Sequence, residues 1–193
     1  FTVSLHWSHR FEGDPDNRWF REQVLALFAC CFLLAFGMGP YYTFYSIGLQ
    51  QAGYGKSAIG WLWSVGVLCE IGIFLLMPRL MARFTLEQLM LASLLVTALR
   101  FVLIALLLAQ PAVAVFAQTL HAFTFGVHHA AAVGLIHRYF AEQHQARGQG
   151  LYVIASFGVG GSAGGLLGGV LWPYGGVTLT FAVSAVVTFL GVL

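Results

Sequence analysis

The stretch from Ala112 to Tyr139 constrains the fold most, because it is long and apolar enough to cross a membrane yet carries three histidines in its interior. A helix needs about 20 mostly apolar residues to cross a bilayer. His121 and His128 are seven residues apart, so on a regular helix they share a face, with Thr124 between them. Ionisable groups in hydrocarbon are costly and usually face a bundle interior or a water-filled path. This stretch therefore indicates a bundle of helices with polar groups gathered inside it.

The composition places the chain in a membrane. Hydrophobic residues make up 59% of it and charged residues 8%, with a mean hydropathy of +0.82, whereas soluble domains carry about 25% charged residues. The apolar residues form long runs instead of the alternation that barrel strands require. We therefore expect an all-α membrane protein that contacts the lipid bilayer and no nucleic acid.

Polar, glycine-rich and proline-containing breaks divide the apolar sequence into six expected transmembrane helices. Residues 1–23 form a polar lead-in, and residues 24–193 form the transmembrane domain. The expected spans cover residues 24–49, 57–80, 87–109, 112–139, 150–172 and 177–193. We also expect the chain to be part of a longer polypeptide.

Several residues predict local features of these spans. Trp19 and Phe20 suit an anchor at the membrane interface. Pro40 predicts a kink or local unwinding in the first span. Glycines four residues apart in the fifth span, such as Gly160 and Gly164, predict close contact with another helix.

The basic residues outside the expected spans fall almost entirely on one side of the membrane. Lys56 is the exception. Because loops rich in Lys and Arg stay in the cytoplasm, we expect both ends to be cytoplasmic. The residues on the expected cytoplasmic side are Arg10, Arg18, Arg21, Arg79, Arg83, Arg138 and Arg147.

Two neighbouring spans each hold one interior charge, Glu70 and Arg100. A carboxylate inside a membrane favours a functional role over a structural ion pair, and one that gains and loses an arginine partner would bind and release a proton. Arg100 continues a polar stripe from Ser93 and Thr97 and stays charged at any relevant pH. It could pair with Glu70, bind a substrate anion or do each in turn, and a purely structural pairing is equally open.

The fourth span supplies further candidates for proton coupling and substrate binding. We favour proton coupling for His121, which lies close to the depth of the two charges. His128 is equally open to substrate binding and to a structural role, whereas His129 points about 100° away and reads as structural. Gln118, one turn before His121, is a candidate substrate ligand.

Metal chemistry has little support in the sequence. His128 and His129 are adjacent, but the HExxH pattern of zinc proteases is absent. Cys30, Cys31 and Cys69 lie in apolar runs without metal-ligand spacing and read as packing residues. We expect neither a metal nor a cofactor, and no enzymatic activity.

Aromatic residues in the first two spans are candidates for solute contacts. Tyr41 and Tyr45 follow the Gly-Met-Gly-Pro segment, and Trp63 lies on the same side of its span as Glu70. The tyrosines could line a binding cavity or form the ordinary aromatic belt at the outer interface, and their place after the break slightly favours a cavity.

The chain resembles the C-terminal six-helix half of a major facilitator superfamily transporter, and within it the phenylpropionate permease family and its relatives near the lactose permease. The likeness covers residues 19–176. It rests on Tyr41-Tyr42-Thr43-Phe44-Tyr45, Gln51-Ala52-Gly53-Tyr54, Ile59 to Val67 leading to Glu70, Leu120-His121-Ala122-Phe123-Thr124-Phe125, and His128-His129-Ala130-Ala131.

This resemblance implies a proton-coupled symporter of twelve helices, in which the solute binds between two halves. Glu70, Arg100 and His121 match by position the residues that such permeases use for solute binding and proton coupling. The acidic residue expected one turn after that histidine is absent, since Thr124 and Phe125 stand there. The implied partners are a small organic solute such as an aromatic acid, protons and the N-terminal half.

Two other functions remain open from the sequence. A non-transporting membrane domain would use the same polar residues structurally, for assembly. An intramembrane metalloenzyme would require a metal held by His121, His128 and His129.

Overall fold

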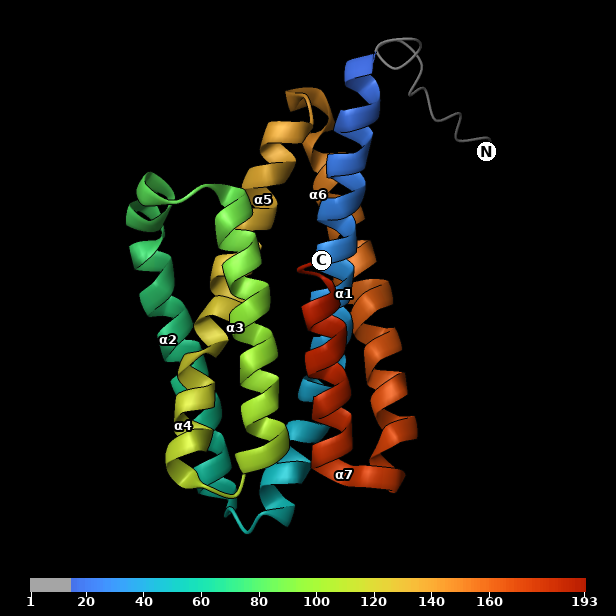
Figure 1. Ribbon diagram of the computed structural model, residues 1–193. Coiled ribbons are helices and arrows are strands. Elements are labelled where there is room, and N and C mark those ends of the chain that lie inside the picture. Colours follow the sequence, from blue (N-terminus) through green and yellow to red (C-terminus); the bar gives the residue numbers. More distant parts are fainter. Residues whose placement is uncertain (1–14) are drawn as a thin grey trace.

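The computed structural model describes the backbone of residues 15–193 and the side chains from residue 21 on. All regular elements in this part of the chain are helical (Figure 1). They are α1 (Pro15–Gln51), α2 (Lys56–Arg83), α3 (Leu86–Leu107), α4 (Pro111–Thr119), η1 (Phe123–Val127), α5 (His128–Tyr139), η2 (Glu142–His144), α6 (Gln145–Val153), η3 (Ile154–Gly161) and α7 (Ser162–Leu190). The predicted features at Arg10, Arg18, Trp19 and Phe20 lie outside the described side chains.

The all-helical membrane architecture agrees with the sequence prediction, whereas length and composition alone pick out four candidate spans. These are Arg21–Gln51, Lys56–Arg83, Leu86–Leu107 and Glu142–Leu190. The stretch predicted as the fourth span is divided at Leu120 and by the π-helix η1. The end of the fifth predicted span and the sixth predicted span both belong to α7, which is interrupted at Gly176, a non-helical residue with φ 51° and ψ −137°. Figure 1 shows the chain turning sharply within α7 and running back as the red arm.

Some helices extend beyond the spans expected from the sequence. The helix α1 begins at Pro15, inside the expected lead-in, and stays helical through Pro40, so of the kink or local unwinding expected there, the unwinding is absent. The helix α2 continues through Pro78 to Arg83. Proline removes one backbone donor but is tolerated in membrane helices where neighbouring groups satisfy the freed carbonyl.

Glycines bring α7 and η3 against α1, as the spacing predicts. A Cβ on Gly164 would overlap the carbonyl oxygen of Phe36, and one on Gly160 would lie 2.9 Å from the carbonyl oxygen of Phe32. The N–H that would normally bond the Phe36 carbonyl belongs to position 40, where proline has none. Gly164 therefore packs where α1 has a free carbonyl, and the two helices touch backbone to backbone.

The helices are arranged so that α3 lies between α4 and α7, with one face, which includes Leu91, Leu95 and Leu99, exposed. α2 packs on α4 and η1, these pack on α3, and α3 packs on α7, which packs on α1 (Figure 1). A capping box starts α3: Thr85 Oγ1 accepts from Gln88 N–H, and Gln88 Oε1 accepts from Thr85 N–H. The central position of α3 explains why its polar stripe, Ser93, Thr97 and Arg100, is fully buried.

Two apolar clusters occupy the two ends of the bundle. One includes Leu62 and Ala117, and the other includes Met77 and Val127. Glu70 lies between the clusters on α2, and His121 lies between them on the stretch from α4 to α5. These two polar residues therefore occupy the middle depth of the bundle.

Candidate functional site

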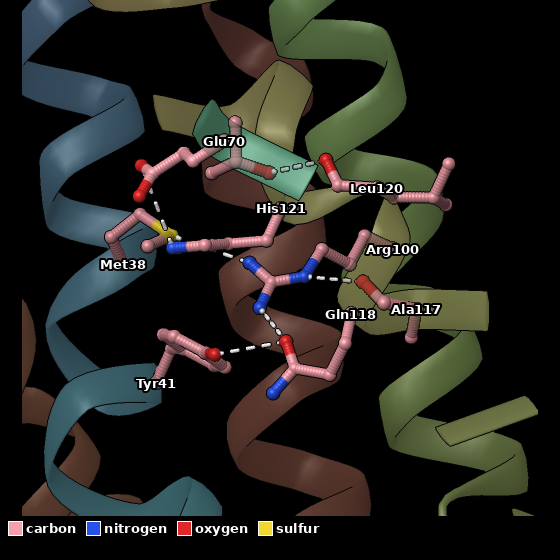
Figure 2. A network of polar contacts seen from close by, with 9 residues as sticks. Met38, Tyr41, Glu70, Arg100, Ala117, Gln118, Leu120 and His121 are labelled. Atoms are coloured by element: carbon pink, nitrogen blue, oxygen red, sulfur yellow. Dashed lines mark hydrogen bonds and ion pairs between the residues drawn. The ribbon is translucent and has the colours of Figure 1, made fainter. Parts of the chain in front are cut away.

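Arg100 is the centre of a buried polar network. Its side chain is fully buried on α3. Its Nε donates to the carbonyl oxygen of Ala117 at 2.9 Å, and its Nη2 donates to Gln118 Oε1 at 3.1 Å (Figure 2). Its guanidinium carbon lies 4.1 Å from the centroid of the Tyr41 ring, and Nη1 lies 3.8 Å from Met38 Sδ.

The partners of this guanidinium are neutral. Among the described residues, none of the recorded ion pairs involves Arg100. Tyr41 O–H donates to Gln118 Oε1 at 3.0 Å, so the amide oxygen is shared by two donors. The amide Nε2 of Gln118 is buried and has no hydrogen-bond partner in the part of the chain that the structure describes. The direct contacts of this buried positive charge are therefore with neutral dipoles and with the rings of Tyr41 and Phe101.

Glu70 lies at the edge of this network and faces His121. Glu70 Oε1 is 3.9 Å from His121 Nε2, with the carboxylate side chain 16% exposed (Figure 2). The imidazole ring lies 5.5 Å from the Tyr41 ring, and its Nδ1 has no hydrogen-bond partner. Gly66 makes room here, since a Cβ on it would lie 3.4 Å from His121 Cδ2. The nearest atoms to this position belong to the side chains of His121 and Gln118.

Of the aromatic candidates, Tyr41 packs on Arg100, and Tyr45 and Trp63 pack on the Tyr41 ring. Tyr41 and Tyr45 are fully buried, with ring centroids 4.8 Å apart. Trp63 lies 5.0 Å from the Tyr41 ring and donates from its indole N–H to Ser46 Oγ at 3.0 Å. A role of these rings in contacting a solute stays a prediction.

His128 lies apart from the other candidate residues. Its Nδ1 is 3.0 Å from Ser93 Oγ, and its ring lines a cavity between α1, η1 and η3. The expectation that His121 and His128 share a face rests on 3.6 residues per turn throughout, whereas π-helical η1 separates them. Wider turns rotate the following residues relative to an α-helix, so the two imidazoles have different partners.

The three histidines do not form a metal centre. His121 faces Glu70, His128 faces Ser93, and His129 Nδ1 lies 3.1 Å from Tyr152 Oη. No group of three or more His, Cys, Asp or Glu side chains with metal-binding geometry occurs among the described residues. Residue spacing alone could not assign these separate partners.

Sequence reasoning missed several groups that the fold places at or beside the site. Met38 and the Ala117 carbonyl contact the guanidinium, and Tyr152, Ser156 and Phe157 line the nearby cavity. Nothing in the sequence marks a methionine within an apolar run, or a backbone carbonyl, as a partner of an arginine. The π-helix around Ser156 cannot be predicted from the sequence either, because a change from α-helical to π-helical hydrogen bonding leaves the hydropathy of a segment unchanged.

Comparisons with known proteins place this geometry in a family. Residues 10–183 match the model of the MFS_1 like family. The chain is also similar to the "Probable 3-phenylpropionic acid transporter" of Escherichia coli (strain K12), with 39% identity over 108 residues. That match covers 56% of this chain and 28% of the relative, so it spans less than a third of the relative's length. No solved structure matches the chain.

The family match covers most of the chain, and the relative at 39% identity carries the name of a transporter. Both findings agree with the resemblance to major facilitator transporters. The chain belongs to the MFS_1-like family of major facilitator transporters.

Proposed function

We propose that this chain forms one half of a proton-coupled symporter for a small organic anion, such as an aromatic acid. The observation that carries the proposal is the fully buried Arg100, whose guanidinium has neutral partners among the described residues. Burying a charge is expensive unless it is paired. A carboxylate solute would supply a countercharge in direct contact and would bind the planar guanidinium in a forked geometry.

Access to the guanidinium runs past Met38. Nη1 is the arm of Arg100 without an oxygen acceptor, and the sulfur 3.8 Å from it belongs to a side chain that also lines the cavity. Methionine is unbranched and flexible. A rotamer change of Met38 would open a path between the cavity and the arginine.

Glu70 and His121 are proposed to handle the proton. Their facing atoms are 3.9 Å apart at middle depth, and Glu70 is the more exposed of the two, with 16% of its side chain accessible against 7% for His121. A small movement of α2 toward α4 would bring them to hydrogen-bond distance, where one proton can be shared. Gln118 and Tyr41 would orient the arginine, and Tyr45 and Trp63 would hold the Tyr41 ring.

The proposed topology has six membrane crossings with both ends in the cytoplasm of a bacterial inner membrane. The turn at Gly176 supports a fifth crossing that runs through α6, η3 and the first part of α7, and a sixth in the rest of α7. The segments α4, η1 and α5 together have the length of the fourth. The relative's greater length supports a second half that closes the solute site. This chain would then supply one wall of that site.

The experiment compares Glu70→Gln with Glu87→Gln in the full-length protein in proteoliposomes. Glu87 is a matched control because it pairs with Arg138 at the surface, where both side chains are about half exposed. Radiolabelled 3-phenylpropionate is the probe. We expect an inward proton gradient to drive its accumulation in the wild type and in Glu87→Gln, and not in Glu70→Gln. Accumulation by Glu70→Gln equal to the wild type would refute proton coupling through this residue.

A further inference from the structure

A cavity of about 270 Å³ lies beside the Arg100 network, between α1, η1, the start of α5 and the segment from α6 to η3. Ligand sites for small molecules are typically 300–1,000 Å³, so this cavity has the size for one small ring. It is lined by residues from both π-helical segments, which include Thr124 and Phe125 in η1 and Ser156 and Phe157 in η3. Single π-helical turns occur frequently at functional sites.

Two residues that line the cavity carry deeply buried polar atoms without a partner among the described residues. Ser156 is 2% exposed and His128 is 3% exposed. Ser156 Oγ and His128 Nε2 make no hydrogen bond to any other group of the described chain. Leaving a buried donor or acceptor unsatisfied costs about 1–3 kcal/mol. Both residues line the same cavity, so a bound group that bridges them would remove both costs.

The contacts of Ser93 favour a proton on Nδ1 of His128. Ser93 Oγ lies 2.6 Å from the carbonyl oxygen of Met90, which can only accept, so the hydroxyl hydrogen is assigned to that bond. With that assignment, the contact of 3.0 Å between Ser93 Oγ and His128 Nδ1 is donated by the imidazole. In the neutral ring one nitrogen donates and the other accepts. His128 Nε2 is therefore a bare acceptor in the cavity wall.

The chemistry of the missing group follows from these two atoms. His128 Nε2 requires a donor, and Ser156 can donate its hydroxyl hydrogen. A hydroxyl group satisfies both at once, because it donates one hydrogen bond and accepts others. A carboxylate accepts only and would leave Nε2 unsatisfied.

The remaining walls are suited to an aromatic ring. Phe125 stacks on His129 with centroids 5.7 Å apart and an interplanar angle of 5°, and Phe125 and Phe157 lie 6.3 Å apart. Tyr152 meets Phe157 edge-on at 5.9 Å. Phe157 is 44% exposed, whereas the two polar residues are buried. Aromatic rings prefer such edge and offset contacts, so a ring could enter past Phe157 with its hydroxyl leading.

We propose that this cavity binds the hydroxyl-bearing aromatic ring of the transported solute, with His128 Nε2 accepting from the ring hydroxyl and Ser156 donating to it. The inference rests on the proposed function and deepens it by naming the solute class as hydroxyaryl acids. Met38 lines the cavity and contacts Arg100, so the carboxylate end of the same solute reaches the guanidinium past one side chain.

The test measures equilibrium binding to the purified full-length protein in detergent by isothermal titration calorimetry. The probes are 3-phenylpropionate and its 3-hydroxyphenyl and 4-hydroxyphenyl analogues. We expect at least one hydroxylated probe to bind about tenfold more tightly than 3-phenylpropionate, the effect of roughly one net hydrogen bond. Ser156→Ala and His128→Phe should each reduce that preference several-fold.

The control is Thr180→Val, which removes another buried hydroxyl without a partner that does not line the cavity. It should leave the preference unchanged. Three results would overturn the inference: equal binding of all three probes to the wild type, no binding of any probe, or a preference that persists in Ser156→Ala. Equal binding would mean that water fills the cavity. Because binding in detergent needs no proton gradient, a failure of the proposed symport would leave the hydroxyl preference intact.

Discussion

The contact between Gly164 and α1 predicts how strongly close packing of α7 on α1 stabilises the bundle. In Gly164→Ala the new Cβ would overlap the carbonyl oxygen of Phe36, and its other near neighbours are also backbone atoms of Phe36. Backbone atoms cannot move aside as a side chain can. The helices α1 and α7 would therefore have to separate along their shared face.

The size of the effect follows from comparison with a second glycine of α7. Overpacking of a tight contact costs typically 1–3 kcal/mol. In Gly169→Ala the Cβ would lie 3.9 Å from Phe44 Cζ, an ordinary van der Waals distance. Both substitutions exchange glycine for alanine in one helix, so their shared gain in helix propensity cancels. We expect Gly164→Ala to be less stable than Gly169→Ala by about 1–3 kcal/mol.

Thermal unfolding of the purified variants in one detergent measures this difference. At 2–4 °C per kcal/mol for a domain of 150–250 residues, the two midpoints should differ by roughly 2–12 °C. Equal midpoints would refute the assignment of Gly164 to a backbone contact, because the two variants differ in little else.

Two further substitutions test the network and the start of α3. Arg100→Lys keeps the charge but cannot reach both Ala117 O and Gln118 Oε1 in the forked geometry; we expect at least tenfold weaker binding of 3-phenylpropionate by calorimetry, and unchanged affinity would contradict this role. Thr85→Ala removes the cap of α3 and should cost about 1 kcal/mol in thermal unfolding, whereas an unchanged midpoint would show that the capping box adds nothing.

The sequence predicts the inward-facing groups of this fold well, because apolar runs and helical spacing are local properties. Ser93 and Thr97 precede Arg100 by seven and three residues, and all three are fully buried on the central helix. The glycine spacing in the fifth span likewise predicts the contact with α1. These inferences need only the geometry of one helix.

Relations between helices could not be predicted from the same pattern. Placing Tyr41 under Arg100 depends on the packing of α1 against α3, and the arginine's choice of Gln118 over Glu70 depends on where α4 lies. The π-helix η1 also changes the direction of His128 relative to His121, although both residues were assigned to one face by a constant period.

The central claim is that the buried guanidinium of Arg100 binds the negatively charged carboxylate of a solute. The most direct measurement compares the affinities of 3-phenylpropionate and its uncharged amide, 3-phenylpropionamide, for the purified full-length protein at one pH and salt concentration. A hydrogen bond to a charged group is worth about 1.5–3 kcal/mol, so we predict that the carboxylate binds at least tenfold more tightly than the amide. Equal affinities would show that no solute carboxylate pairs with the guanidinium.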